Sequence, residues 1–179
     1  MSAAVNRLTQ CITYLQLLPS LVTLLSPLFL STFSTFNQFI LYKMASAAGC
    51  IFCRIIKGEI PCFKLFESDK TLAFLDIGPL SKGHALVIPK YHGEKLADIP
   101  DDHLSEVLPT LKKIVNATGA TDYNILQNNG AIAHQEVKHV HFHMIPKPNE
   151  KEGLGVGWPT QSPDMDALKA YYEEIKSRI

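Results

Sequence analysis

The sequence lacks charge over a long stretch near its start, where no charged side chain occurs between Leu8 and Tyr42. Acidic residues are missing over an even longer stretch, because none of the 17 precedes Glu59. The whole chain balances 17 basic against 17 acidic residues, so it has no broad excess of positive charge of the kind that nucleic-acid-binding domains show. Nucleic acid is therefore not an expected partner, and the change in composition near Met44 divides the chain in two.

Cysteine is scarce as well, with four residues in 179, and the sequence contains no internal repeat. A chain of this length with 46% hydrophobic residues can bury a core without a disulfide framework, so a cross-linked secreted domain is not expected. Cys50 and Cys53 nevertheless form a C-x-x-C pair, which in a reduced compartment indicates metal or redox chemistry. Cys62 is expected to pack only against neighbouring side chains.

The first 43 residues are largely apolar and are interrupted by Pro19 and Pro27. Their apolar runs together are long enough for a helix of about 20 residues to cross a bilayer. Three interpretations stay open: a membrane anchor, an organelle-targeting leader, or a segment absent from the main product because translation starts at Met44. We therefore expect an extension at 1–43 and a domain at 44–179, with membrane contact only where the extension is retained.

The domain mixes helical and strand-like patterns. Apolar residues recur at helical spacing between Pro100 and Gly119, with a kink or break predicted at Pro109. Asp164 is predicted to cap a last helix that continues to Ile175. Short β-prone runs predict strands at 63–67, 71–77, 84–89, 123–127 and 137–145. The pattern indicates an α+β fold with a mostly antiparallel sheet.

Three histidines, His139, His141 and His143, alternate with apolar residues in one of these predicted strands. Side chains on a strand alternate between faces, so the three imidazoles are expected on one face, roughly 6.5–7 Å apart. Imidazole titrates near neutrality and can act as nucleophile, acid, base or metal ligand. From the residues alone, the row indicates either a catalytic site for a charged group or a metal-binding row.

The run His139-Val-His-Phe-His-Met-Ile145 resembles the histidine triad motif of the histidine triad (HIT) superfamily. The match extends over residues 50 to about 148, and it looks like the branch of histidine triad nucleotide-binding proteins. Three more stretches match this family in the same order: Cys50–Pro61, Ala73–Ile77 and Gly83–His92. Three others suggest a fungal member: Asn128–Gly130, Ala133–Glu136 and Val156–Pro159.

The resemblance implies a fold, an assembly and a location. The fold would be a five-stranded antiparallel sheet with helices packed against it, paired into a homodimer. The apolar face of the helix after Pro100 is a candidate interface, although the sequence does not show whether the sheet or a partner covers it. The domain is expected in the cytoplasm and nucleus, with an organelle or a membrane as the alternative if residues 1–43 are retained.

The resemblance also implies catalytic roles. His141 would attack the α-phosphorus of a purine nucleotide and form a nucleotidyl-histidine, while a backbone carbonyl within the motif holds its other ring nitrogen. His143 and Gln135 would hold phosphate oxygens, and His84 would lie beside the leaving group or the triad. His139 completes the triad and is included among the catalytic residues.

The implied nucleotide contacts involve other residues. Asn128 would complete the phosphate pocket, Asp76 would accept hydrogen bonds from the ribose, and the base would lie between apolar side chains. The alternative for these apolar residues is that they belong to the core; they are Ile51, Phe52 and Ile77. One position departs from the family pattern, because Glu136 follows Gln135 where a hydroxyl residue is common. Its carboxylate either changes the leaving-group preference or points away from the site.

A metal site is implied by the same resemblance. Two cysteines and two histidines make a Cys₂His₂ set of the kind that binds structural zinc in tetrahedral geometry. The alternative is that the thiols are free and buried. The four candidate ligands are Cys50, Cys53, His92 and His139.

Three functions follow from these observations. The first is a hydrolase of the adenosine 5'-monophosphoramidase type that releases AMP. The second is a dinucleoside polyphosphate hydrolase, which would use the same His141 on an anhydride. The third is a nucleotide-sensing scaffold that acts by binding partners. The opening Cys50-Ile-Phe-Cys53 favours the first.

Overall fold

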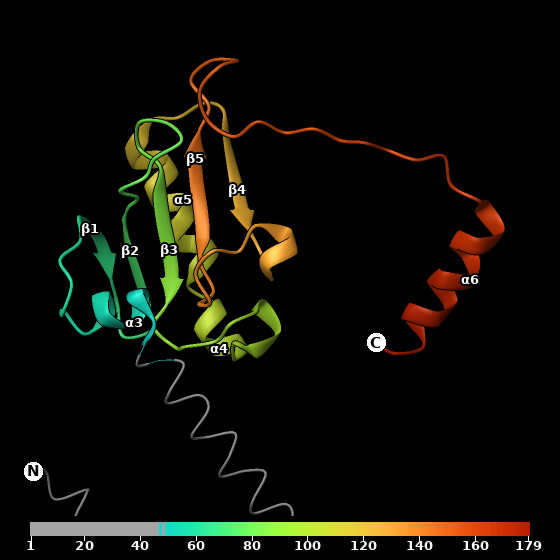
Figure 1. The fold of residues 1–179 in the computed structure, drawn as a ribbon, viewed down its shortest axis with the longest axis horizontal. Helices are drawn as coiled ribbons and strands as arrows, with labels where there is room; N and C mark the ends of the chain where they lie inside the picture. Colours follow the sequence, from blue (N-terminus) through green and yellow to red (C-terminus); the bar gives the residue numbers. More distant parts are fainter. Residues whose placement is uncertain (1–46, 48) are drawn as a thin grey trace, which may run out of the picture.

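The computed structural model of this chain describes residues 47 and 49–179 (Figure 1). The interpretations of residues 1–43 as anchor, leader or absent segment lie outside this range and stay predictions. Among the residues that are described, no helix has the length and apolar content that crossing a bilayer requires.

A five-stranded antiparallel sheet forms the centre of the domain, in the order β1-β2-β3-β5-β4. The predicted α+β fold is therefore confirmed. Strand β5, which carries His143, lies between β3 and β4, so both of its edges are paired with neighbours. The strands are β1 (Lys64–Glu67), β2 (Thr71–Leu75), β3 (Ala85–Pro89), β4 (Tyr123–Gln127) and β5 (Phe142–Pro146).

Helices cover the two faces of this sheet differently. On one face α3 (Ile51–Ile56) packs Phe52 against alternate residues of β2 and β3, including Phe74 and Leu86. On the other face α5 (Val107–Thr118) packs its apolar side against the intervening residues. The apolar face of the helix after Pro100 is thus covered by the protein's own sheet.

Two predicted elements differ from the structure by more than a residue or two. The helix after Pro100 is broken before Pro109, into α4 (Asp101–Leu104) and α5. Proline is tolerated in the first turn of a helix, where backbone N–H groups have no intrahelical acceptor, so Pro109 fits at the start of α5. The strand predicted at 137–145 begins only at Phe142, because residues 137–139 form a bend and residues 140–141 lie outside the sheet.

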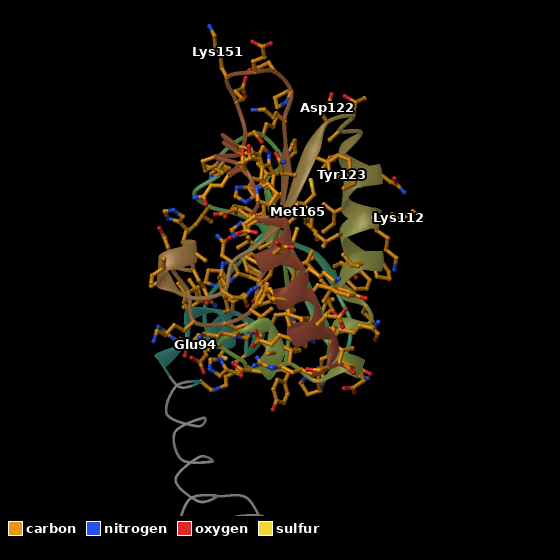
Figure 2. The ribbon with its side chains drawn as sticks, turned by 90° about the vertical axis from the view of Figure 1, so that its right-hand side faces the viewer. Glu94, Lys112, Asp122, Tyr123, Lys151 and Met165 are labelled. Atoms are coloured by element: carbon orange, nitrogen blue, oxygen red, sulfur yellow. The ribbon has the colours of Figure 1, made fainter. Side chains whose placement is uncertain are left out.

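The C-terminal segment leaves the domain after β5 and ends in α6 (Met165–Lys176), which stands off on the β4 side of the sheet (Figure 1). Figure 2, viewed from that side, shows Met165 at the start of the helix. Asp164 caps α6 as predicted, because its carboxylate accepts hydrogen bonds from the N–H groups of Asp166 and Ala167 at 3.0 and 3.2 Å. The segment 154–164 is irregular apart from this cap.

Candidate active site

The three histidines of the motif lie at the boundary between the core and a cavity. His139 and His141 are buried on the segment before β5, and His143 is half-buried on the strand itself. The rings of His141 and His143 are 4.9 Å apart between centroids. Phe52 of α3 meets both His139 and His141 edge to face, with centroids 5.9 and 5.2 Å apart. The helix therefore holds the ring of His141 in a fixed orientation.

His141 has the geometry of a nucleophile. Its Nδ1–H donates to the carbonyl oxygen of His139 at 2.6 Å, which confirms the backbone contact that the family resemblance implies. This bond places the proton on Nδ1 and leaves the Nε2 lone pair free. Burial lowers the pKa of His141, and the carbonyl contact and two nearby carboxylates only partly oppose this effect. The ring is therefore neutral near neutral pH, as nucleophilic attack requires.

A chain of hydrogen bonds fixes the protonation of His84 and His143. The backbone N–H of Leu80 donates to Nδ1 of His84 at 3.2 Å, so the proton of neutral His84 lies on Nε2. That Nε2–H donates to Nδ1 of His143 at 2.9 Å. His143 therefore carries its own proton on Nε2, where it can be donated to a ligand. Burial, followed by the nearby His141 and His84, lowers the pKa of His143 to about 4.

Asp76 follows β2 and lies beside these histidines. One of its carboxylate oxygens accepts the backbone N–H of Gly78 at 2.8 Å, and the other lies 3.6 Å from Nε2 of His84. The first contact orients the carboxylate, and the second oxygen can accept hydrogen bonds from a ligand.

A cavity of about 580 Å³ opens in front of the histidines. Its volume is in the range of small-molecule sites, and its walls combine an apolar part with a polar part, as such sites usually do. Most of the nucleotide-contact and catalytic residues predicted from the sequence line it, namely Ile51, Phe52, Asp76, Ile77, His84, Asn128, His141 and His143.

The apolar wall residues differ in burial, which bears on their alternative assignment to the core. Phe52 is buried at 7% exposure and belongs to a core cluster as well as to the wall. Ile51 is 44% exposed and Ile77 is 88% exposed, so neither is a core residue. An isoleucine this exposed on a cavity wall is available to contact a flat apolar ligand.

Two predicted residues do not line the cavity, Gln135 and His139. Gln135 is buried, and its side-chain amide bonds to backbone: Nε2–H donates to the carbonyl of Glu94 at 2.5 Å, and Oε1 accepts the N–H of Gly130 at 2.6 Å. Gln135 thus fixes the loop around it. His139 turns instead toward the two cysteines of the C-x-x-C pair.

Several residues that line the cavity were not predicted from the sequence, notably His134 and the residues of the apolar wall beyond α3. His134 has a left-handed backbone, with φ 61°, at the end of the short turn η3 (Ala131–Ala133). Glu136 also lines the cavity, so its carboxylate does not lie on a remote surface. No periodic pattern marks these loop positions, because the conformation of the loop between β4 and β5 brings them to the cavity.

The four predicted metal ligands come together at the end of the histidine run. Cys50, Cys53, His92 and His139 each offer one donor atom, and all four donors lie within 4.8 Å of one another. The two Sγ atoms are each 3.6 Å from Nδ1 of His139, and the two Nδ1 atoms are 3.3 Å apart. Tetrahedral zinc with ordinary bond lengths places sulfur and nitrogen ligands roughly 3.6 Å apart and two nitrogens roughly 3.3 Å apart.

The surroundings of this cluster also suit a metal. The Nε2–H of His139 donates to the carbonyl of Pro89 at 2.8 Å, which directs the Nδ1 lone pair toward the cysteines. Burial, together with the adjacent Cys50, raises the pKa of the Cys53 thiol to about 12. A thiolate at this position therefore requires a cation beside it. The residues present fit a divalent, thiophilic ion.

Comparison with known proteins agrees with this geometry. The HIT domain model matches residues 57–150. Adenosine 5'-monophosphoramidase HNT1 of Candida albicans is 55% identical over 144 residues, which cover 76% of this chain and 95% of that protein. Adenosine 5'-monophosphoramidase hnt1 of Schizosaccharomyces pombe is 58% identical over 131 residues, covering 73% and 98%.

Solved structures show the same relationship. The crystal structure of a histidine triad nucleotide-binding protein from Candida albicans superposes with a TM-score of 0.70 at 54% identity, covering 73% of this chain and 96% of that one. A HIT family member from Bacillus subtilis gives a TM-score of 0.68 at 36% identity, covering 73% and 97%. This chain belongs to the HIT domain family. The similarity to fungal proteins agrees with the resemblance suggested by the sequence motifs.

Proposed function

We propose that this protein hydrolyses adenosine 5'-monophosphoramidates and releases AMP, with His141 as the nucleophile. One observation carries the proposal: His141 is neutral and buried beside the cavity, with Nδ1 held by a backbone carbonyl and Nε2 free. The names of the fungal relatives, which are adenosine 5'-monophosphoramidases, support the choice of substrate.

The reaction consists of two displacements at the α-phosphorus. Nε2 of His141 attacks phosphorus, the phosphorus–nitrogen bond breaks, and the amine leaves with that electron pair and takes up a proton from solvent, so that a nucleotidyl-histidine remains. Water then attacks phosphorus and gives up a proton to solvent, the bond to Nε2 breaks with its electron pair returning to nitrogen, and AMP is released with His141 restored. The Nε2–H of His143 is the donor best placed to stabilise charge on the phosphate oxygens, because His84 fixes its proton.

The base, the ribose and the phosphate of the nucleotide contact different walls of the cavity. The base contacts the apolar wall of Ile51, Phe52 and Ile77, and the second carboxylate oxygen of Asp76 accepts from the ribose hydroxyls. Asn128 lies on the polar wall near the phosphate and is itself held, because its side-chain N–H donates to the carbonyl of His134 at 3.2 Å. Gln135 acts on the phosphate indirectly, by fixing the loop that surrounds it.

A zinc ion would be held by Cys50, Cys53, His92 and His139, and its chemistry there is structural. Four protein donors complete a tetrahedral shell, which leaves no position for substrate or water. The ion would tie α3 to the segment before β5, so that Phe52 keeps its contact with the ring of His141.

The homodimer implied by the family resemblance forms part of the proposal. With the apolar face of α5 covered by the sheet, the exposed strand β4 is the better interface. It is an edge strand, and Tyr123 and Ile125 are both more than two-fifths exposed. An edge strand with exposed apolar side chains favours pairing with a second chain. Light scattering of native protein and Ile125→Lys tests this, and a native mass of one chain would contradict it.

The proposed activity is tested by measuring AMP release from adenosine 5'-monophosphoramidate and from a diadenosine polyphosphate. Both substrates are given to native protein, His141→Ala and His103→Ala. His103 is a control outside the cavity, where its ring contacts Tyr91. We expect native protein and His103→Ala to cleave the phosphoramidate and His141→Ala to release no measurable AMP. Faster cleavage of the polyphosphate would favour the alternative hydrolase. Nucleotide binding without release from either substrate would favour the sensing scaffold.

A further inference from the structure

Two carboxylates line the cavity, and they differ in what they already contact. Asp76 is partly buried and engaged with Gly78 and His84. Glu136 is exposed, and it forms no ion pair with any other residue that the structure describes. Its charge is therefore free to act on whatever occupies the adjacent part of the cavity.

The position of Glu136 corresponds to the leaving-group side. Displacement at phosphorus places the attacking and leaving atoms roughly in line on opposite sides. His141 is buried at 5% exposure, so it attacks from the inner end of the cavity and the leaving group lies toward the open end. Glu136 combines exposure to solvent with a place in the cavity wall, which locates it at that open end.

The backbone on both sides of Glu136 is anchored. Gln135 is tied to Gly130 and Glu94 through its side chain, and Val137 packs against the core cluster beneath α3. Because both neighbours are anchored, the backbone of Glu136 keeps its place at the cavity wall. Glu136 is also close enough for its charge to act on the ring of His141, in the direction that favours protonation.

We propose that Glu136 determines leaving-group specificity, favouring amines that carry a positive charge and disfavouring anionic ones. The inference rests on the proposed function, which it extends to the class of amine released. A cation on the departing amine lies within several ångströms of the carboxylate in a solvent-exposed setting. Such an interaction changes a rate by a factor of roughly 3 to 10 and is weakened by salt.

The test uses three amides of AMP with substituents of similar length on nitrogen: butyl, 3-aminopropyl and 2-carboxyethyl. The value of kcat/KM for each is measured for native protein, Glu136→Gln and the control Glu173→Gln. Glu173 is an exposed carboxylate on α6, outside the cavity. The substitution to glutamine keeps the size of the side chain and removes only its charge.

We expect native protein and Glu173→Gln to prefer the aminopropyl amide over the butyl amide, and to hydrolyse the carboxyethyl amide most slowly. Glu136→Gln should reduce the preference for the cationic amine by about 3- to 10-fold while changing the butyl rate by less than about 2-fold. The preference in native protein should also decline with added salt.

Two results would overturn the inference. Equal losses on all three substrates would mean that Glu136 acts in proton transfer or in loop structure. Unchanged ratios would mean that its charge does not reach the leaving group. In both cases AMP release that depends on His141 would still stand, whereas the absence of release from every amide would overturn the proposed function as well.

Discussion

The two ends of the histidine run have the same sequence pattern and opposite surroundings. His139 is fully buried and faces two thiols, whereas His141 and His143 face a cavity large enough for a small molecule. Alternation along the chain directs all three side chains to one side, but the element that covers them decides their chemistry. The start of α3 covers His139 with Cys50 and Cys53, and the cavity begins beyond Phe52.

Alanine substitutions at His141 and His139 should impair different properties, turnover in the first case and stability in the second. This is the largest effect we expect. His141→Ala should lower the rate of AMP release by about 10³-fold or more and lower Tm less than His139→Ala does, because it removes the nucleophile from the cavity wall and not a side chain from the closed core. His139→Ala should first lower Tm, because it opens a cavity in the core and removes a cluster ligand. Turnover and thermal unfolding of both variants check the contrast. An equal loss of Tm in the two variants would contradict the assignment of a structural role to His139 and a catalytic role to His141.

Removing one thiol should isolate the role of the cluster. Cys53→Ser is expected to abolish stoichiometric zinc binding and to lower the free energy of unfolding by about 2 kcal/mol or more. Cys62→Ser is the matched control, because Cys62 packs against the same core cluster but is not one of the four metal donors. Metal analysis and denaturant unfolding measure both effects. If native protein purified without chelators contains well under one equivalent of zinc, the proposed zinc site is contradicted.

Acid should lower the free energy of unfolding through His143, at the cavity end of the histidine run. Its pKa is about 4 in the folded protein, against an ordinary value of 6.5, so above pH 6.5 it is neutral in both states and does not affect stability. As pH falls from 6.5 to about 4, the unfolded chain binds the proton more readily, and stability declines. Below about 4 this group causes no further loss. Denaturant unfolding at pH 7 and pH 4.5 should show a smaller acid loss for His143→Asn than for native protein.

The smallest effect concerns the apolar wall. Ile77→Ala should leave the free energy of unfolding within about 0.5 kcal/mol, because the side chain is 88% exposed. The same change should weaken AMP binding by roughly 3- to 10-fold, since about 1 kcal/mol of apolar contact with the base is lost. Calorimetric titration with AMP measures the second effect. A large loss of stability with unchanged AMP affinity would restore the assignment of Ile77 to the core.

Much of the fold and the centre of the site could be predicted, because their signals are local. Short β-prone runs identified the strands, Gly119 ended α5 with its left-handed conformation, and Asp164 capped α6. The family motifs identified eight of the residues that line the cavity, including both histidines of the triad that face it. Helix α3 was not predicted, because six residues are too few to show helical periodicity.

The remaining features depend on contacts between distant parts of the chain. The side-chain amide of Gln135 is taken up by the carbonyl of Glu94, 41 residues away, and no local pattern indicates this pairing. The place of Glu136 in the cavity wall likewise follows from the anchoring of its neighbours in three dimensions. The sequence shows that Glu136 replaces the hydroxyl residue common at this position, but only the folded loop places it in the cavity wall.

His139 belongs to both regions, since its side chain points into the cysteine cluster while its carbonyl oxygen holds Nδ1 of His141. The two sites therefore share one residue. A ligand that restricts residue 139 would also restrict the carbonyl oxygen that holds the ring of the nucleophile. If metal binding changes the affinity for nucleotide through this residue, nucleotide binding changes the affinity for metal by the same factor. Metal binding at the cysteine cluster would then affect nucleotide binding at the active site as well as the stability of the fold.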